Sequence, residues 1–557
     1  MRKLFKYFKS RIIFDSILLI SIIIFYSINN YIWIKNRNPF PLYPDESEHL
    51  IQSFRYYRLM IDPNPVIFKN LIYLIKGYRF PPFFLFTSAM LNLLFGASKV
   101  VSTMTNILYL AILLFSVYYL GKKSDNRNVG LLSAFILSMF PFVFGMSRVF
   151  MLDFALMAMI TFSICSLVYT NNFTSTKFSL FFGVSLGLGM LTKWTYPLFI
   201  IGPLLYTLFC IFKQLQISKF SSFRIQISNI LLSFSIGFFL SLLYYYDSEW
   251  LGKGITKNSF LPTIVHETNW RTFSGCTFYI RSIFPWQVSL PFSILFLFIL
   301  PIFLKSHIKY KPTLFYWLIT PITILTFIPN KWGRHIMPVL PSIALILAIG
   351  IEKLSWKKLK VAVISLIFIV GVSQYLLISY NKNFEYKHQS FMGSIFSPPK
   401  VETELSKIVN NIIPDFIIPN SNYNSSTSSN KNINIGVIDS VPLMMLSNAF
   451  NYSIIEKALN CSIFNFPDEH EYILRNFIVD KLDYIITVRP KDNPWPSEKE
   501  IRQIFKIEQF GKMFNISDKD YEKYVQIFAE LASNFRIIKT INCSNKFYIF
   551  ILSKKVN

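Results

Sequence analysis

Acidic residues are scarce in this sequence, and the scarcity is confined to one part of the chain. The 557 residues include 30 Asp and Glu against 56 Lys and Arg. Residues 1–379 hold 11 acidic and 35 basic residues, a net charge of +24, whereas residues 380–557 hold 19 and 21, a net charge of +2. The positive charge of the first part gathers in short loops between apolar runs, as the positive-inside rule of membrane proteins requires. We therefore expect a membrane protein with no nucleic-acid partner.

Cysteine is also rare, and it forms no metal-binding pattern. Cys165 and Cys210 lie in apolar runs, which indicates packing residues, and a Cys461–Cys543 disulfide is compatible with an extracytoplasmic C-terminal part. The five cysteines show no CxxC pair and no metal spacing; they are Cys165, Cys210, Cys276, Cys461 and Cys543. The sequence also lacks a phosphate-cradling glycine loop and a Ser-His-Asp pattern. It therefore predicts no metal, nucleotide or serine-hydrolase site.

Apolar residues, by contrast, are abundant. The chain is 52% hydrophobic, contains 58 Phe and has a mean hydropathy of +0.41, which is too apolar for a soluble enzyme. Its apolar runs have the length that crosses a hydrocarbon core of about 30 Å. We predict a polytopic α-helical membrane protein with about eleven transmembrane helices, near residues 12–33, 101–120, 129–146, 154–170, 179–192, 196–212, 227–246, 285–304, 312–328, 338–351 and 361–379. No small-residue cleavage site follows the first run, which indicates an uncleaved span.

The basic loops support this topology. If the basic N-terminus lies in the cytoplasm, the cytoplasmic loops are 121–127, 213–226, 305–311 and 352–360, and each of them is basic. A further span at 80–97 would reverse this pattern, so we predict an interfacial or re-entrant helix there, begun by Pro81-Pro82 and ended by Gly96. The region 34–100 then forms an outer loop.

Residues 380–557 have a different composition and predict a small extracytoplasmic α/β domain of unknown role. An Asn/Ser-rich stretch near 420–432 indicates a flexible loop. Strands are expected at 433–438, 484–488 and 547–552, with helices near 440–460 and 498–532. Residues 1–379 form the transmembrane domain in this interpretation.

The most informative polar motif is Asp45-Glu46, which follows the first span and Pro44. Carboxylates close to a bilayer are costly and tend to mark function. A general base must reach the proton that it removes, and an outer loop over the helices could place a carboxylate there. The alternative is a helix start, since acidic residues are favoured in a first turn.

Three further polar groups fall on the same predicted side. Arg148 and Asp153 bridge the end of one span and the start of the next, where Arg148 could bind a phosphate and Asp153 a sugar or a basic neighbour. The alternative is an interfacial Arg with an Asp at a helix start. Lys193 interrupts an apolar region and either contacts a phosphate or marks a boundary. The third group is a basic cluster on a side that the charge rule disfavours, formed by Lys331, Arg334 and His335, which indicates an anionic lipid headgroup or a chance interfacial cluster.

In their order along residues 10–380, these elements resemble the GT-C superfamily of membrane glycosyltransferases. The elements are PDE in the first outer loop, RFPP with LFG, GKK, SRVFMLD, LGLGMLTK and KWGRHIMPVLP. The branch most similar in pattern comprises protein O-mannosyltransferases and aminoarabinose transferases, which use polyprenyl-phosphate sugars. Two departures are His335, where the family usually has Tyr, and Trp194, where it commonly has Gly.

The resemblance implies an inverting transfer of one sugar from a polyprenyl-phosphate carrier to a protein, lipid or glycan acceptor at the outer face. Asp45 and Glu46 would be catalytic, and the donor phosphate and sugar would contact Arg148, Asp153, Lys193, Lys331, Arg334 and His335. No cofactor is required in this interpretation, although Asp45 and Glu46 could hold a divalent cation. The alternatives are a lipid-linked sugar translocator without transferase activity and a polymerase or ligase that uses polyprenyl diphosphates.

The expected location follows from composition and topology. A sequence rich in Lys, Asn, Ile and Phe is typical of an AT-rich genome, which favours a prokaryotic plasma membrane with the active site facing outside. The alternative is an enzyme of the endoplasmic reticulum, which would share this topology.

Overall fold

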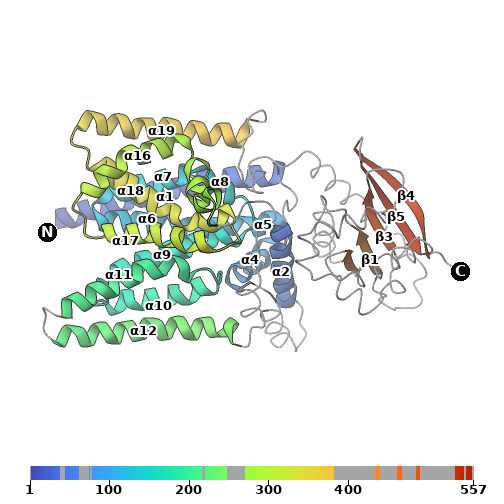
Figure 1. Cartoon of the computed structure of the whole chain (residues 1–557), viewed down its shortest axis with the longest axis horizontal. Helices are drawn as coiled ribbons and strands as arrows, with labels where there is room; N and C mark the ends of the chain where they lie inside the picture. The colour runs from blue at the N-terminus through green and yellow to red at the C-terminus, as the bar shows by residue number, and fades with distance from the viewer. Residues whose placement is uncertain are drawn as a thin grey trace. The chain divides into compact units, whose positions relative to one another are not determined.

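The computed structural model describes two compact units (Figure 1). One comprises Met1–Arg37 with Arg55–Ser397, and the other comprises Asn38–Phe54 with Pro398–Asn557. The described residues are 2–37, 44–61, 75, 78, 80–215, 220–246, 270–381, 433–438, 461–466, 484–489, 534–544 and 547–554.

The first unit is a bundle of helices whose long members lie side by side (Figure 1). Its helices are α1 (Arg2–Arg37), α4 (Phe83–Phe95), α5 (Lys99–Met104), α6 (Asn106–Ser124), α7 (Arg127–Met139), α8 (Pro141–Met146), α9 (Leu152–Tyr169), α10 (Thr176–Met190), α11 (Pro197–Leu215), α12 (Phe220–Tyr245), α14 (Phe273–Cys276), α15 (Phe278–Arg281), η2 (Ser282–Gln287), α16 (Leu290–Lys305), α17 (Lys311–Phe327), η3 (Gly333–Val339), α18 (Leu340–Glu352) and α19 (Lys357–Tyr380). A further helix, α2 (Pro44–Ile61), begins among the residues of the second unit and ends among those of the first.

A helix lies at each of the eleven predicted spans. Among the described residues, seven helical segments are long and apolar enough to cross a membrane by themselves, and an eighth consists of Phe278–Gln287 and Leu290–Lys305, which are bent by 113°. The predicted spans at 129–146, 179–192 and 312–328 correspond to shorter helices. The polytopic α-helical membrane fold is thus confirmed.

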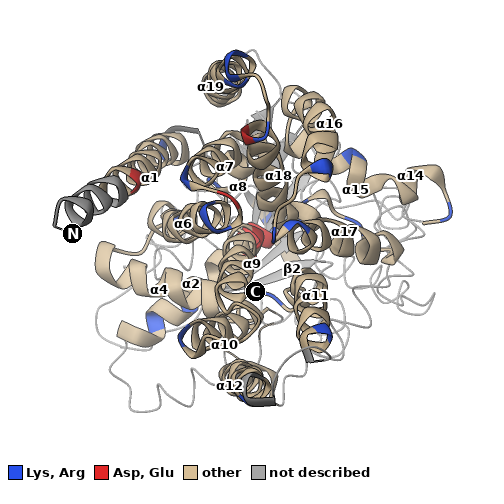
Figure 2. Cartoon of the chain, turned by 90° about the vertical axis from the view of Figure 1, so that its left-hand side faces the viewer, with Lys and Arg blue, Asp and Glu red and all other residues tan. Residues whose placement is uncertain are grey.

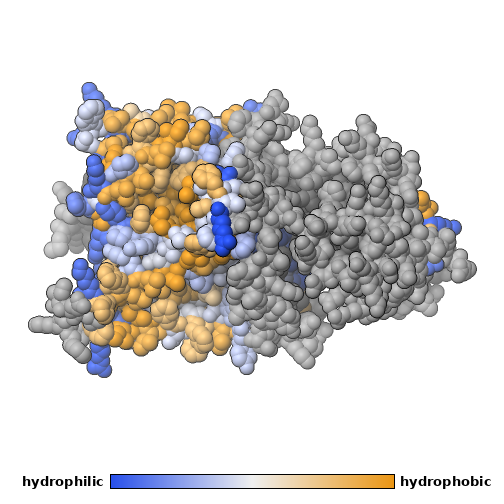
Figure 3. All heavy atoms as spheres, in the orientation of Figure 1, coloured by the Kyte–Doolittle hydropathy of each residue, from blue (hydrophilic) through white to orange (hydrophobic). Residues whose placement is uncertain are grey.

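Two helices form the centre of the bundle. In both Leu152–Tyr169 and Gly333–Glu352, 89% of the 18-residue apolar stretch is buried inside the protein. The corresponding share is 22% for Phe223–Leu242 and for Lys357–Tyr380. The outer helices therefore carry the apolar band on the surface of the bundle (Figure 3). The end of the bundle that holds the basic loops shows many Lys and Arg and few acidic residues (Figure 2). This arrangement places the start of α9 and of α18 deep in protein, at the other end.

The predicted helix at 80–97 is present, and its limits are those expected. It is α4, with Pro82 as N-cap and Gly96, at a φ of 87°, immediately after its last residue. The backbone nitrogen of Phe83 donates to the carbonyl of Leu191 at 2.9 Å, which ties the start of α4 to the end of α10. The depth of α4 in a bilayer stays a prediction.

The second unit contains a five-stranded mixed sheet with the order β2-β1-β3-β5-β4. Its strands are β1 (Ile433–Ile438), β2 (Cys461–Phe466), β3 (Tyr484–Arg489), β4 (Phe535–Ser544) and β5 (Phe547–Lys554), with β1 parallel to β2 and β3, and β5 antiparallel to β3 and β4. The strands predicted at 433–438, 484–488 and 547–552 are thus observed. The stretches at 420–432, 440–460 and 498–532 lie outside the described residues.

The sheet order contradicts the Cys461–Cys543 disulfide. Cys461 lies in β2 and Cys543 in β4, at opposite edges of the sheet with three strands between them. Strands about 4.8 Å apart separate these edges by about 19 Å. A disulfide needs Cα atoms within about 7 Å, so these two cysteines do not pair within one chain.

Candidate active site

Three of the predicted site residues, Lys193, Arg334 and His335, meet at Asp153. Asp153 lies in the first turn of α9, where the partial positive charge of a helix N-terminus stabilises a carboxylate. Its side chain is 3% exposed, and its Oδ1 accepts a hydrogen bond from Lys193 Nζ at 2.8 Å. Arg334 Nε lies 3.9 Å from Asp153 Oδ2, and His335 interacts electrostatically with the same carboxylate. One buried carboxylate therefore lies close to two cationic side chains, which gives this cluster a net positive charge.

Lys193 reaches Asp153 because the chain turns between α10 and α11. The backbone nitrogens of Thr192 and Lys193 both bond to the carbonyl of Gly189, which closes the end of α10. The ring of Tyr196 packs on Gly189 so closely that a Cβ there would lie 2.2 Å from it, and the Tyr196 hydroxyl donates to Ser163 on α9 at 2.6 Å. The glycine is thus needed for the close approach that brings the turn against α9.

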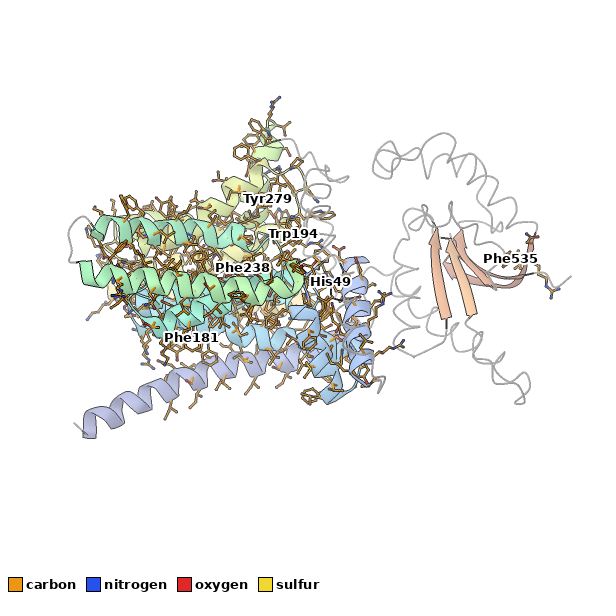
Figure 4. The ribbon with its side chains drawn as sticks, turned by 90° about the horizontal axis from the view of Figure 1, so that it is seen from below. His49, Phe181, Trp194, Phe238, Tyr279 and Phe535 are labelled. Carbon is orange, nitrogen blue, oxygen red and sulfur yellow. The ribbon has the colours of Figure 1, made fainter. Side chains whose placement is uncertain are left out.

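Trp194 follows Lys193 in this turn. Phe181, near the start of α10, and Trp194 lie toward opposite ends of the bundle (Figure 4). Trp194 is partly exposed and directly follows Lys193, so this departure from the usual family pattern is adjacent in the chain to the Asp153–Lys193 pair.

Arg334 is held by the irregular segment that precedes α18. Its guanidinium lies 5.4 Å from the centre of the Trp332 ring. Gln287 Nε2 donates to the carbonyl of Gly333 at 2.6 Å and fixes the same segment from η2. These contacts explain how a residue 181 positions after Asp153 reaches its carboxylate.

Lys331 lies in the same segment, but its amine is directed to a helix end. Lys331 is fully buried, and Nζ donates to the carbonyls of Thr326 and Ile328, the latter at 2.7 Å. These groups belong to the C-terminus of α17, whose partial negative charge favours a cation. Burial lowers the pKa of Lys331 to about 8.

Arg148 has a different environment from Asp153, although both belong to the SRVFMLD motif. It is fully buried, donates from Nε to Asn30 Oδ1 at 3.1 Å and from Nη2 to Ser379 Oγ at 2.8 Å, and thereby joins α1 to α19. Its guanidinium also lies 5.2–5.4 Å from the ring centres of Trp33, Phe144 and Tyr375. Among the described residues no carboxylate pairs with it, so an aromatic cage takes the place of a counter-ion. Sequence patterns gave no signal for Asn30 or Ser379.

Asp45 and Glu46 lie in the first turn of α2, which begins at Pro44. The structure therefore has the start of a helix at this point and not a loop, which was the second of the two interpretations of the sequence. Glu46 is fully buried, whereas Asp45 is partly exposed. Both belong to the second unit, whereas Asp153, Lys193, Arg334 and His335 meet in the first. The catalytic role of the pair stays a prediction.

Among the described residues, no three His, Cys, Asp or Glu side chains cluster as metal ligands. At Asp153 the two adjacent cations would repel a metal ion. A divalent cation at Asp45 and Glu46 stays a prediction.

Comparisons with known proteins agree with this architecture. A family model described as dolichyl-phosphate-mannose-protein mannosyltransferase matches residues 79–238, which include Arg148, Asp153 and Lys193. Among solved structures, the chain is similar to ArnT from Cupriavidus metallidurans bound to undecaprenyl phosphate, with a TM-score of 0.60 at 9% identity over 96% of this chain and 97% of that chain. For the apo state of ArnT the TM-score is 0.59 at 10% identity, with the same coverage. No curated protein matches the chain in sequence.

The resemblance predicted from the sequence is thereby confirmed. The structural likeness gives the fold of the helical unit, and the family model covers 160 of the 557 residues, the part that holds Arg148, Asp153 and Lys193. The alternative of a translocator without transferase activity receives no support from these comparisons.

Proposed function

We propose that the protein transfers one sugar from a polyprenyl-phosphate donor to an acceptor at the outer face of a prokaryotic plasma membrane, with inversion. The observation that carries this proposal is the Asp153–Lys193–Arg334 cluster, in which two cations meet one buried carboxylate. The similar structure of ArnT is bound to undecaprenyl phosphate, a phosphate on a polyprenyl chain, which supports this donor class.

The donor phosphate would bind at the net positive charge of the cluster. During transfer the bond between the anomeric carbon and the phosphate oxygen breaks, and its electron pair stays on the phosphate. Lys193 and Arg334 would stabilise this growing charge, a contribution that is strongest in a buried site. Asp153 would hold both cations in place, and His335 would contact the sugar or the phosphate.

The acceptor would be activated by Asp45. The acceptor oxygen or nitrogen forms the new bond to the anomeric carbon, and its proton passes to the Asp45 carboxylate. Asp45 is the partly exposed member of the pair and can meet an acceptor, whereas the fully buried Glu46 would position Asp45 or the acceptor. This chemistry neutralises a monophosphate leaving group with protein cations and requires no metal.

The experiment is a transfer assay with purified full-length protein, radiolabelled polyprenyl-phosphate sugars and membrane extract as acceptor. Wild type should move label to a protein, lipid or glycan, and Lys193→Met should not. Exposed Lys358→Met, at the far end of the bundle, is a control of the same chemical change. If label moves only from polyprenyl diphosphate donors, the proposed donor class is wrong and the protein is a polymerase or ligase.

A further inference from the structure

A pocket lies at the other end of the helical unit from Asp153. It has a volume of about 330 Å³ and is bounded by the last turn of α9, the loop that follows it, the last turns of α11 and the start of α17. Because α9 begins beside Asp153 and ends at Tyr169, its rise of 1.5 Å per residue places the pocket about 24 Å from the Asp153 cluster. The pocket therefore belongs to the end that carries the basic loops.

Two lysines line this pocket, and neither pairs with a carboxylate among the described residues. Lys213 lies in the last turn of α11, and Lys309 lies just before α17. Lys309 Nζ donates to Asn171 Oδ1 at 3.2 Å and lies 5.2 Å from the centre of the Tyr310 ring. No Asp or Glu is among the described residues of the lining.

Two other lysines of the same end are paired with carboxylates. Lys353 lies 2.6 Å from Asp125, and Lys360 lies 2.6 Å from Glu352. Among the lysines with described side chains at this end, Lys213 and Lys309 thus combine uncompensated charge with a pocket. Such a site attracts an anion.

The remaining lining indicates what kind of anion fits. Leu167 and Val168 are buried in the wall, and the Tyr310 hydroxyl has no hydrogen-bond partner in the described part of the chain. A ligand oxygen would supply that partner after a small side-chain movement. Phe209 and Phe212 lie within about one turn of Lys213 on α11 and are each 61% exposed, as expected of side chains that contact lipid tails. The cations thus stand beside an apolar, lipid-facing helix surface.

We propose that this pocket binds the phosphate headgroup of an anionic phospholipid from the leaflet that faces the basic loops. A basic pocket between membrane helices on the cytoplasmic side is a typical anionic-lipid site. The two lysines would bind the phosphate oxygens, and the acyl chains would run along the exposed face of α11. A free phosphate shares the headgroup chemistry but would leave the apolar surface beside Lys213 unused.

The test measures thermal unfolding of the full-length protein in a neutral detergent, with increasing short-chain phosphatidylglycerol. The test variant is Lys213→Gln/Lys309→Gln. The matched control is Lys357→Gln/Lys358→Gln, which removes two exposed lysines from the same end of the bundle. We expect phosphatidylglycerol to raise the Tm of wild type and control alike. The test variant should need about 10- to 30-fold more lipid for the same shift.

Three results would overturn the proposal. The first is a Tm rise that is lost equally in both double variants. The second is a Tm rise with phosphatidylcholine that equals the rise with phosphatidylglycerol. The third is an equal Tm rise with inorganic phosphate, which would assign the pocket to a soluble anion. A second measurement does not depend on the variants: native mass spectrometry of wild type from mixed phosphatidylglycerol and phosphatidylcholine nanodiscs. Retention of phosphatidylglycerol in excess of its share supports the site, and retention in proportion to its share contradicts it.

Discussion

Lys193 and Asp153 are 40 residues apart in the chain, and Lys193 Nζ lies 2.8 Å from Asp153 Oδ1 with both side chains almost completely buried. Two short pieces of sequence at the ends of different helices thus share one ion pair. Substitution of either residue alone should destabilise the fold, because a buried charge that loses its partner is strongly destabilising.

Single and paired substitutions at these two residues should separate stability from catalysis. Lys193→Met and Asp153→Asn should each cost about 3–5 kcal/mol of unfolding free energy, since each leaves a buried charge without its nearest partner. The double variant should be more stable than either single variant, yet it should transfer sugar at least about 100-fold more slowly than wild type. Thermal unfolding and the transfer assay measure the two quantities.

A matched control for this cycle is present in the same chain. Lys353→Met and Asp125→Asn remove a partly exposed pair with a separation of 2.6 Å at the other end of the bundle, where the cost should be about 0–1 kcal/mol. If the double variant of Lys193 and Asp153 transfers sugar normally, the cluster is structural and the donor binds elsewhere.

Asp45→Asn should lower the rate of transfer by about 100- to 10,000-fold, the contribution of a general base. Donor affinity should stay within twofold, because the proposed phosphate contacts lie on other residues. Glu48→Gln is the control, since Glu48 is a partly exposed carboxylate of the same helix. A normal rate for Asp45→Asn would remove the base assignment.

Arg148→Lys should lower thermal stability while donor affinity stays unchanged. Lysine lacks the planar fork that reaches Asn30 and Ser379 together, and its cation suits the three aromatic rings less well. The measurements are the Tm and equilibrium binding of the labelled donor. Weakened donor binding at an unchanged Tm would restore the phosphate role expected from the sequence.

Lys331 should make stability depend on alkaline pH. Burial lowers its pKa in the folded protein to about 8, below the value of 10.5 for an exposed lysine. Between these values the unfolded chain binds the proton and the folded chain does not, so the contribution of Lys331 to stability rises with pH from about 8 to 10.5. Relative to Lys331→Met, the wild-type Tm should therefore increase between pH 7.5 and pH 10. An unchanged difference across this range would contradict the pKa shift.

Chelation of divalent cations should leave transfer unchanged. The proposed chemistry neutralises the leaving phosphate with Lys193 and Arg334. Purified protein assayed in EDTA, and again after addition of Mg²⁺ or Mn²⁺, measures this directly. A loss of activity that Mg²⁺ restores, and that Asp45→Asn makes insensitive to Mg²⁺, would place a cation at Asp45 and Glu46.

The sequence alone was enough to predict the helices and the polytopic membrane fold. Each apolar run must satisfy its own backbone hydrogen bonds in a membrane, so length and hydropathy are enough to predict it as a helix. The limits of α4 follow from Pro82 and Gly96, whose backbone preferences are local. The order of weak motifs was sufficient for the GT-C resemblance.

Only the tertiary structure decided which polar residues meet. Arg148 and Asp153 are five residues apart, yet one joins α1 to α19 while the other pairs with Lys193. Lys331 and Arg334 are three residues apart, yet one donates to the end of α17 while the other approaches Asp153. The physical reason is that ion pairs between helices depend on how the helices pack, and the periodicity of each helix does not contain that information.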